Sequence, residues 1–262
     1  MEKGVYQASR KDGGIYYRSS FTFRNKHISL GSFSSEETAH SAYAEAVSIS
    51  SDTGVTIQDY NPESHSLSFS KWVAIINFRD NHIYFKTPIY LKPKYFEYYL
   101  SEEIVLKFDV DDLFFYSTHT IMKRGSHLFV ADYGMQLNIL NRYGIKNFAV
   151  SGRDYRFVNG DDTDFRYKNI DIINRYYGVS REDRNGRISY ITKIHINGDF
   201  LIGRFREETD AAIAYNKAVD ILTERGIGIR YTKNYIDGLN TEDYLKHYEK
   251  IKIPEKIRDY NP

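Results

Sequence analysis

The chain contains two copies of one sequence pattern, and this internal repeat constrains its fold more than any other feature. The first copy contains Gly4-Val5, Leu30-Gly31-Ser32-Phe33 and Tyr43-Ala44-Glu45-Ala46-Val47. The second contains Gly178-Val179, Ile202-Gly203-Arg204-Phe205 and Tyr215-Asn216-Lys217-Ala218-Val219. The offset is 174 at the Gly-Val pair and 172 from Gly31 and Gly203 onward, so the second copy is two residues shorter in its hairpins.

Each copy predicts three short strands. The central strands, Tyr16 to Phe23 and Ile188 to Ile196, alternate and are rich in aromatic and β-branched residues. Turn-forming segments precede them at Lys11-Asp12-Gly13-Gly14 and Asp183-Arg184-Asn185-Gly186. Tight hairpins are expected at Arg24-Asn25 and Asn197-Gly198, and a third strand ends at each Gly-x-Phe.

A helix is expected after the third strand of each copy. The expected N-cap is Ser34 or Ser35, and Glu36 and Glu37 follow in the first turn, where the helix dipole favours them. Small and aromatic residues then recur at helical spacing, namely Ala39, Ala42, Tyr43 and Ala46, and Ala211, Ala214, Tyr215 and Ala218. Small residues on that stripe let the helix lie close against a three-stranded sheet.

The repeat resembles the Apetala-two/ethylene-response-factor DNA-binding domain, and more closely the version that is fused to phage homing endonucleases. The resemblance covers residues 2 to 50 and 175 to 226 and depends on the Gly-Val, the [Leu/Ile]-Gly-x-Phe and the Ala-Tyr helix. It implies a sheet that lies in the major groove and contacts bases and phosphates with its outer face. The arginine that follows Gly-Val in the plant domains is Tyr6 here and Ser180 in the second copy, so the plant target sequence does not transfer.

Charge is distributed unevenly within each copy, although the whole chain has a net charge of only +1. Residues 3 to 33 contain six bases and one acid, whereas residues 34 to 50 contain three acids and no base. Residues 175 to 206 contain seven bases and three acids, and residues 207 to 224 one base and five acids. Basic strands next to an acidic helix favour a sheet that attracts phosphates. The DNA-binding candidates are Lys3, Arg10, Lys11, Arg18, Arg24 and Lys26 in the first copy, and Arg175, Arg181, Arg184, Arg187 and Lys193 in the second.

The segment between the copies is electrically neutral and resembles an HNH homing endonuclease. Asn159, Gly160, Asp164, Arg166 and Asn169 match the nuclease pattern, and Val110-Asp111-Asp112 resembles its opening. On this resemblance the water-activating histidine falls on Phe157, the central asparagine on Phe165 and a metal-binding histidine on Asn138. Phenylalanine can neither accept a proton nor bind a cation, so we expect a degenerate nuclease domain without catalytic residues.

The sequence therefore predicts an α+β protein in which two three-stranded antiparallel sheet-plus-helix modules flank a mixed, HNH-like central domain. The expected domains are residues 1–62, 63–173, 174–231 and a helical tail, 232–262. Strands are expected at Ala74 to Phe78 and Ile83 to Tyr90, and again in the stretch from Ile104 to Tyr116. A helix with a Thr241 cap is expected in the tail, which ends on Asp259-Tyr260-Asn261-Pro262, an echo of Asp59-Tyr60-Asn61-Pro62.

Composition narrows the function classes. Cysteine is absent, which excludes disulfides and thiolate metal sites, and no apolar run approaches the roughly 18 residues of a membrane helix. We expect no catalytic residues, metal, cofactor, membrane or small-molecule substrate, and a cytoplasmic location. The leading hypothesis is a sequence-specific double-stranded DNA-binding protein, namely a phage transcription regulator derived from a homing endonuclease. Two alternatives are a metal-dependent endonuclease that uses Asp161, Asp162 and Asp164, and a protein-interaction or virion component.

Overall fold

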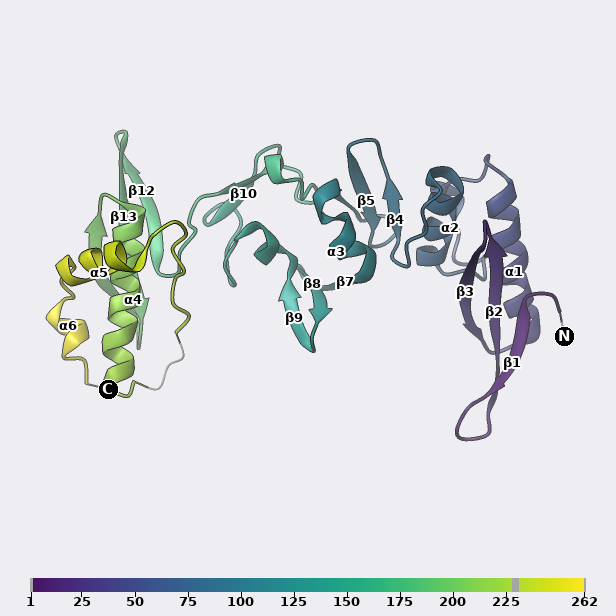
Figure 1. Cartoon of the computed structure of the whole chain (residues 1–262), viewed down its shortest axis with the longest axis horizontal. Coiled ribbons are helices and arrows are strands. Elements are labelled where there is room, and N and C mark those ends of the chain that lie inside the picture. The colour runs from purple at the N-terminus through teal and green to yellow at the C-terminus, as the bar shows by residue number, and fades with distance from the viewer. Residues whose placement is uncertain (1, 228–230, 262) are drawn as a thin grey trace. The chain divides into compact units, whose positions relative to one another are not determined.

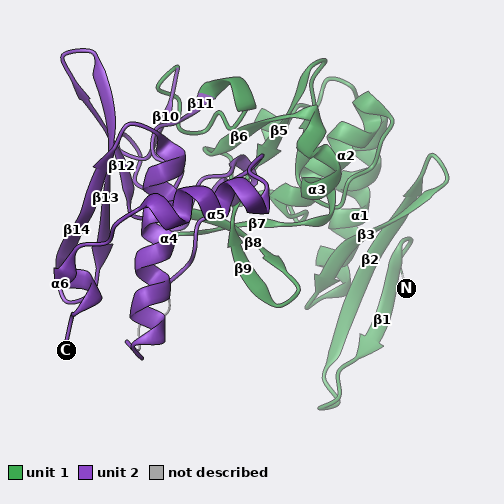
Figure 2. Cartoon of the chain, turned by 60° about the vertical axis from the view of Figure 1, so that its left-hand side comes forward, with its two compact units in different colours: residues 1–139, 159–169 green, residues 140–158, 170–262 purple. Residues whose placement is uncertain are grey.

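The computed structural model describes residues 2–227 and 231–261, which divide into two compact units. Unit 1 comprises Met1–Ile139 and Asn159–Asn169, and unit 2 comprises Leu140–Val158 and Ile170–Pro262 (Figures 1 and 2). The described part of the chain contains six α-helices, four three-stranded sheets and one two-stranded sheet, which confirms a mixed α+β class. Residues 63 to 173, which the sequence assigns to one central domain, are divided between the two units. No helix within residues 2–227 and 231–261 is long and apolar enough to cross a bilayer.

The first copy of the repeat forms three antiparallel strands and a helix, as the periodicity predicts. The strands β1 (Val5–Ser9), β2 (Ile15–Phe23) and β3 (Lys26–Phe33) pair in that order, and α1 (Glu36–Ser51) follows. Arg24 and Asn25 form the β2–β3 turn with φ of 46° and 62°, the conformation of the tightest hairpins. Ser35 is the N-cap of α1, and its side chain accepts the Thr38 N–H at 3.1 Å.

The second copy has the same architecture. The strands β12 (Val179–Arg184), β13 (Arg187–His195) and β14 (Asp199–Phe205) form an antiparallel sheet in that order. The helix α4 (Glu208–Glu224) lies across this sheet (Figure 1). The β12–β13 turn consists of Asn185 and Gly186 alone. Each hairpin of the second copy is one residue shorter, because Val5 pairs with Ser19 and Ser19 with Gly31, whereas Val179 pairs with Thr192 and Thr192 with Gly203.

A contact between glycine and tyrosine explains why both copies contain Gly-Val and Ala-Tyr. Gly4 and Gly178 have φ of 79° and 71°, a backbone conformation that favours glycine. A Cβ on Gly4 would lie 2.0 Å from Tyr43 Cδ2, and one on Gly178 would lie 2.2 Å from Tyr215 Cδ2. Each glycine carbonyl also accepts a backbone N–H from the central strand, from Ser20 at 3.0 Å and from Lys193 at 2.8 Å. The motif therefore joins the start of the sheet to the helix at van der Waals distance.

The helix that follows the first copy corrects one expectation. Residues 74 to 78 do not form a strand but belong to α2 (Phe69–Asn81), which packs against α1. All residues from Trp72 to Arg79 are buried, so this helix lacks the amphipathic period by which a surface helix is recognised. The Arg79 Nη1 donates to the carbonyls of Ile49 (3.1 Å), Asp52 (2.6 Å) and Val55 (2.9 Å), which ties the end of α1 to α2.

The rest of unit 1 consists of small sheets and short helices. The run from Ile83 to Tyr90 is a strand only at its end, because Pro88 lacks the N–H that a paired strand requires. The stretch from Ile104 to Tyr116 is part strand and part helix. The elements are the 3-10 helix η1 (Ile57–Asp59), β4 (Ile89–Leu91), β5 (Tyr95–Tyr99), β6 (Val105–Asp109), η2 (Val110–Asp112), α3 (Leu113–Thr118), β7 (Ile121–Arg124), β8 (His127–Asp132), β9 (Met135–Asn138) and η4 (Tyr167–Asn169). The sheets are β4-β5-β6 and β7-β8-β9, both antiparallel.

Unit 2 contains a hairpin of β10 (Tyr155–Phe157) and β11 (Ile170–Ile172), and a tail that packs on α4. The 3-10 helix η3 (Ile139–Tyr143) spans the boundary between the units in sequence. The tail helices are α5 (Thr241–Lys250) and α6 (Glu255–Arg258). The α5 cap is Asn240 and not Thr241, because the Asn240 side chain accepts the Asp243 N–H at 2.9 Å.

Candidate nucleic-acid interface

Strand register defines two faces in each repeat sheet. Directly paired residues share a face, and the face of Val5, Phe21 and Ile28 is buried beneath α1. The pairing register shifts between Ser19 and Ser20 and, at the matching place in the second sheet, between Thr192 and Lys193. The face opposite the helix in each sheet is called the outer face below.

The outer face of the first sheet combines basic, aromatic and hydroxyl side chains. Tyr6, Arg18 and Ser32 lie side by side across the three strands, and Tyr6 is 57% exposed. The Arg18 Nη2 donates to the Tyr16 hydroxyl at 2.8 Å, and its guanidinium lies 5.5 Å from the centre of that ring. No residue of β1, β2 or β3 is acidic. The face therefore offers several donors and no carboxylate.

The other predicted bases of the first copy occupy different places. Arg24 lies in the β2–β3 turn, with its guanidinium 5.1 Å from the Phe23 ring. Lys26 pairs with Phe23 on the helix side, and its Nζ lies 5.9 Å from the Tyr84 ring centre. Lys3 lies next to α1, because its carbonyl is 3.3 Å from His40 Nδ1. Lys26 and Lys3 are exposed but are not part of the outer face.

A groove lies at the end of the first sheet, where the β1–β2 hairpin brings Arg10 and Lys11 next to the end of β3. Its volume is about 500 Å³, and it is lined by Ser9, Arg10, Lys11, Tyr16, Ser32, Phe33 and Ser34. The hairpin is closed by the Arg10 N–H, which donates to the Gly14 carbonyl at 2.7 Å. This groove therefore extends the basic outer face to the hairpin.

The second outer face contains bases as well, but some are paired internally. Arg184 pairs with Arg187 across β12 and β13, and Lys193 pairs with Leu201 across β13 and β14. Glu182 forms ion pairs with Arg184 at 3.0 Å and with Arg204. Desolvation by its neighbours opposes it, but hydrogen bonds from these two arginines hold the Glu182 pKa below its usual value.

Two predicted bases of the second copy lie on the helix side. Arg181 shares a face with buried Val179, and its backbone N–H donates to the Asn174 side chain at 2.7 Å. Burial raises the pKa of Glu208 at the start of α4, and the charges of Arg175 and Arg181 act against this rise. These two arginines therefore balance a half-buried carboxylate. Arg204 was not among the predicted bases, although it lies between Gly203 and Phe205 in a strand and pairs with Ile191 on the outer face.

The segment with the predicted nuclease resemblance, residues 159 to 169, includes a loop that is stabilised by ion pairs and hydrogen bonds. Asp164 is buried and accepts two hydrogen bonds from Arg166, at 2.7 Å and 2.6 Å. Asp161 accepts the Thr163 N–H and hydroxyl at 3.0 Å and 2.6 Å and pairs with Lys107 at 3.1 Å. Hydrogen bonds from Thr163, together with Lys107, lower the Asp161 pKa.

The remaining matching positions also have structural partners. Asn169 Nδ2 donates to the carbonyls of Asp161 and Asp164, and its Oδ1 accepts the Asn159 N–H at 2.8 Å. Burial opposes it, but the Arg166 hydrogen bonds hold the Asp164 pKa below its usual value. Phe165 is buried and stacks on Phe108 at 5.5 Å. In the described part of the chain, no three His, Asp or Glu side chains are grouped so that they could hold a metal ion.

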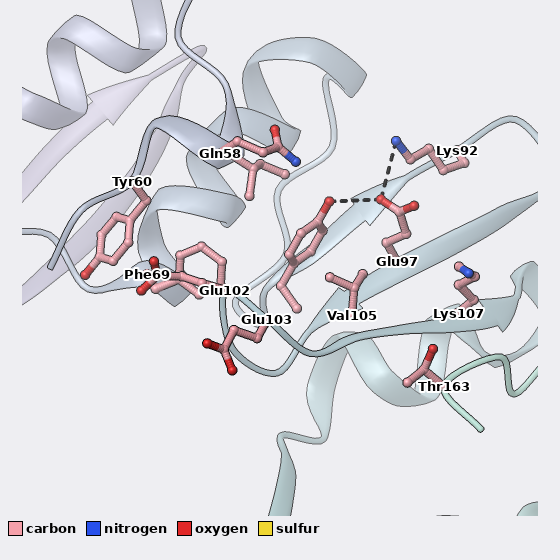
Figure 3. Close-up of a pocket in the computed structure, with 12 residues that line it drawn as sticks. Gln58, Tyr60, Phe69, Lys92, Glu97, Glu102, Glu103, Val105, Lys107 and Thr163 are labelled. Carbon is pink, nitrogen blue, oxygen red and sulfur yellow. Dashed lines mark hydrogen bonds and ion pairs between the residues drawn. The ribbon is translucent and has the colours of Figure 1, made fainter. Parts of the chain in front are cut away.

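A hollow of unit 1 has a volume of about 550 Å³ and lies where β5 and β6 meet the segment around η1 (Figure 3). Its wall contains Tyr60, Phe69 and the acid Glu97. The Glu97 carboxylate already has two partners within the protein: the Tyr99 hydroxyl donates to it at 2.9 Å, and Lys92 Nζ forms an ion pair with it at 3.3 Å (Figure 3). Burial and this carboxylate both raise the pKa of Tyr99.

The chain matches no protein-family model, no curated protein and no solved structure at a significant level.

Proposed function

We propose that the protein binds double-stranded DNA through the outer faces of its two repeat sheets. The observation that supports this most strongly is the outer face of the first sheet. It exposes Arg18 beside Tyr6 and Ser32, it continues to Arg10 and Lys11 in the hairpin, and its strands contain no acid. Cations bind phosphates, while hydroxyl and aromatic groups can contact base edges and sugars.

The two faces contribute unequally in this proposal. When the register shifts are superposed, Arg18 corresponds to Ile191, and Ser20 corresponds to Lys193. The second face has Arg187 and Lys193 available, while Arg184 and Arg204 are held by Glu182. We therefore propose that the first sheet supplies most of the affinity and that the two sheets contact different sequences.

We further propose that the protein is a regulator and not a nuclease. Support comes from Asp161 and Asp164, which are neutralised by Lys107 and Arg166 and so are poor ligands for a catalytic cation. Supercoiled plasmid should stay uncut in the presence of magnesium or manganese. Nicking that disappears in Asp161→Ala would instead make the protein an endonuclease.

Fluorescence anisotropy with the full chain and a random-sequence duplex tests DNA binding. We expect Arg18→Gln to weaken binding and to reduce the slope of log affinity against log salt by about one. Lys26→Gln is the matched control, because it removes the same charge from the helix side of the same sheet. In unit 2, Arg187→Gln and Arg181→Gln form the corresponding pair.

Equal effects of Arg18→Gln and Lys26→Gln would mean that the outer face has no special role. No binding of any duplex by the wild-type chain would rule out the proposal. If the wild-type chain does bind, selection of bound duplexes from a random pool shows whether the face that contains Arg18 confers sequence specificity.

A further inference from the structure

We propose that the groove at the end of the first sheet is a phosphate-binding site, and that in a DNA complex it holds one backbone phosphodiester. The inference rests on the proposed function only for the identity of the phosphate donor. The groove itself is defined by the side chains that line it and by a comparison between the two copies of the repeat.

The lining of the groove is suited to an anion. Arg10 and Lys11 supply two cations, and hydroxyl groups come from Ser9, Tyr16, Ser32 and Ser34. No carboxylate lines the groove. The nearest acid in sequence is Asp12, whose Oδ1 accepts the Gly14 N–H at 3.0 Å and so completes the turn. A phosphate prefers just this combination of charge and hydrogen-bond donors.

The hydroxyl of Tyr16 is oriented to act as a donor. It already accepts a hydrogen bond from Arg18 Nη2 at 2.8 Å. Its own proton is therefore available for another acceptor, and a phosphate oxygen in the groove would supply one. Arg18 thus connects the groove to the rest of the outer face.

The second copy shows what an arginine at this place can do. At the offset of 174 that relates β1 to β12, Arg10 corresponds to Arg184, and at the offset of 172 Ser32 corresponds to Arg204. Both arginines of the second copy form ion pairs with the carboxylate of Glu182. At the same offset of 174, Glu182 corresponds to Ala8 in the first copy. The second copy thus supplies an internal anion where the first has a methyl group and an open groove. In the first copy, an external anion would take the place of this carboxylate.

Within the described residues, neither Arg10 nor Lys11 makes an ion pair with a carboxylate, and both side chains are exposed. A bound phosphate would therefore not need to displace an internal partner. In the second copy the same phosphate would have to compete with Glu182 for Arg184, so the site is specific to the first copy.

The decisive experiment compares Arg10→Gln/Lys11→Gln with Lys86→Gln/Lys94→Gln in the full chain. The control pair removes the same charge from exposed residues of unit 1 outside the repeat sheet. Affinity for duplex DNA is measured across a salt series, on natural DNA and on DNA with single neutral methylphosphonates. We expect the groove variant to reduce the salt slope by about one, with equal weakening on every sequence. One methylphosphonate position should weaken the wild type and leave the groove variant unchanged.

A second arm uses inorganic phosphate without DNA, and follows backbone amide shifts by NMR against a chloride control of equal ionic strength. We expect shifts at Arg10, Ser32 and Ser34 that are lost in the groove variant. If duplex binds but the groove and control variants behave alike, the groove proposal is wrong and DNA binding stands. If phosphate shifts these residues but no duplex binds, the groove is a phosphate site and the proposed function is wrong. Shifts spread evenly over exposed lysines would overturn the site.

Discussion

Replacement of Gly178 by alanine tests whether the glycine–tyrosine contact sets the geometry of the module. The new Cβ would lie 2.2 Å from Tyr215 Cδ2 and 2.4 Å from the Lys193 carbonyl oxygen. The Tyr215 ring could turn away, but the Lys193 carbonyl belongs to the paired backbone of β13. The sheet itself must therefore shift to admit one methyl group.

Two costs add up in this variant. An alanine at φ of +71° costs about 1–2 kcal/mol of folding free energy, because its Cβ crowds the following carbonyl. Overpacking a site of fixed shape costs a further 1–3 kcal/mol or so. The expected loss of stability is thus roughly 2–5 kcal/mol. Gly186→Ala is the matched control, since its φ is +78° but no atom lies within 4 Å of its Cβ. The control carries only the first cost.

Hydrogen exchange at the Lys193 amide measures this locally, because that N–H donates to the Gly178 carbonyl at 2.8 Å. We expect its protection to fall in Gly178→Ala by about 1–3 kcal/mol more than in Gly186→Ala. Trp72, the single tryptophan, lies in unit 1. We therefore expect the urea midpoint of the unfolding transition that Trp72 fluorescence reports to be the same in both variants. Equal protection in the two variants would refute the steric argument and leave Tyr215 as an incidental neighbour.

Three further predictions concern charged residues. Arg79→Met leaves three carbonyls at the end of α1 without their donor, and should destabilise unit 1 by about 2–4 kcal/mol in urea unfolding followed by Trp72 fluorescence. The Asp164 pKa is lowered in the folded protein, so the ionised carboxylate stabilises the fold. This stabilisation is complete above the unfolded carboxyl pKa and is lost as the pH falls through the folded value. Asp164→Asn should therefore remove this pH dependence from the free energy of unfolding, measured between about pH 5 and pH 2. Glu182→Gln frees Arg184 and Arg204, so DNA affinity should rise and its salt slope should steepen by up to about two, whereas Asp199→Gln, which frees only His195, should change the slope less. An unchanged slope in Glu182→Gln would mean that the second outer face does not contact DNA.

The repeat modules could be predicted from sequence because their elements depend on local signals. The β2–β3 turn at Arg24-Asn25, the cap at Ser35 and the alanine stripe of α1 each determine structure within a few residues. The helix α2 could not be predicted in this way. It is buried on all sides, so its apolar run has neither the period of a strand nor that of a surface helix.

The candidate interface was only partly accessible from sequence. All eleven predicted bases are exposed, since charged side chains avoid burial. Exposure does not define a face, however. The two-residue turn pairs Lys26 with Phe23 and so places it on the helix side, and Arg181 follows Val179 to the same side of its own sheet. The ion pairs of Glu182 with Arg184 and Arg204 could not be predicted from sequence either, because Arg204 comes from β14, two strands away from Glu182.

The two copies have kept their interior and changed their exterior. Inside, Gly4 with Tyr43 matches Gly178 with Tyr215, and each register shift lies opposite a glycine. Outside, Arg18 is replaced by Ile191, and Ser32 by Arg204. Because the interior fixes the same sheet-plus-helix arrangement in both copies, we expect a difference in function between them to arise from the outer faces and the hairpins. If the two faces had the same ligand, their exposed positions would have been constrained as strongly as the contact between glycine and tyrosine. Under the proposed function, this divergence predicts that each sheet contacts a different stretch of DNA.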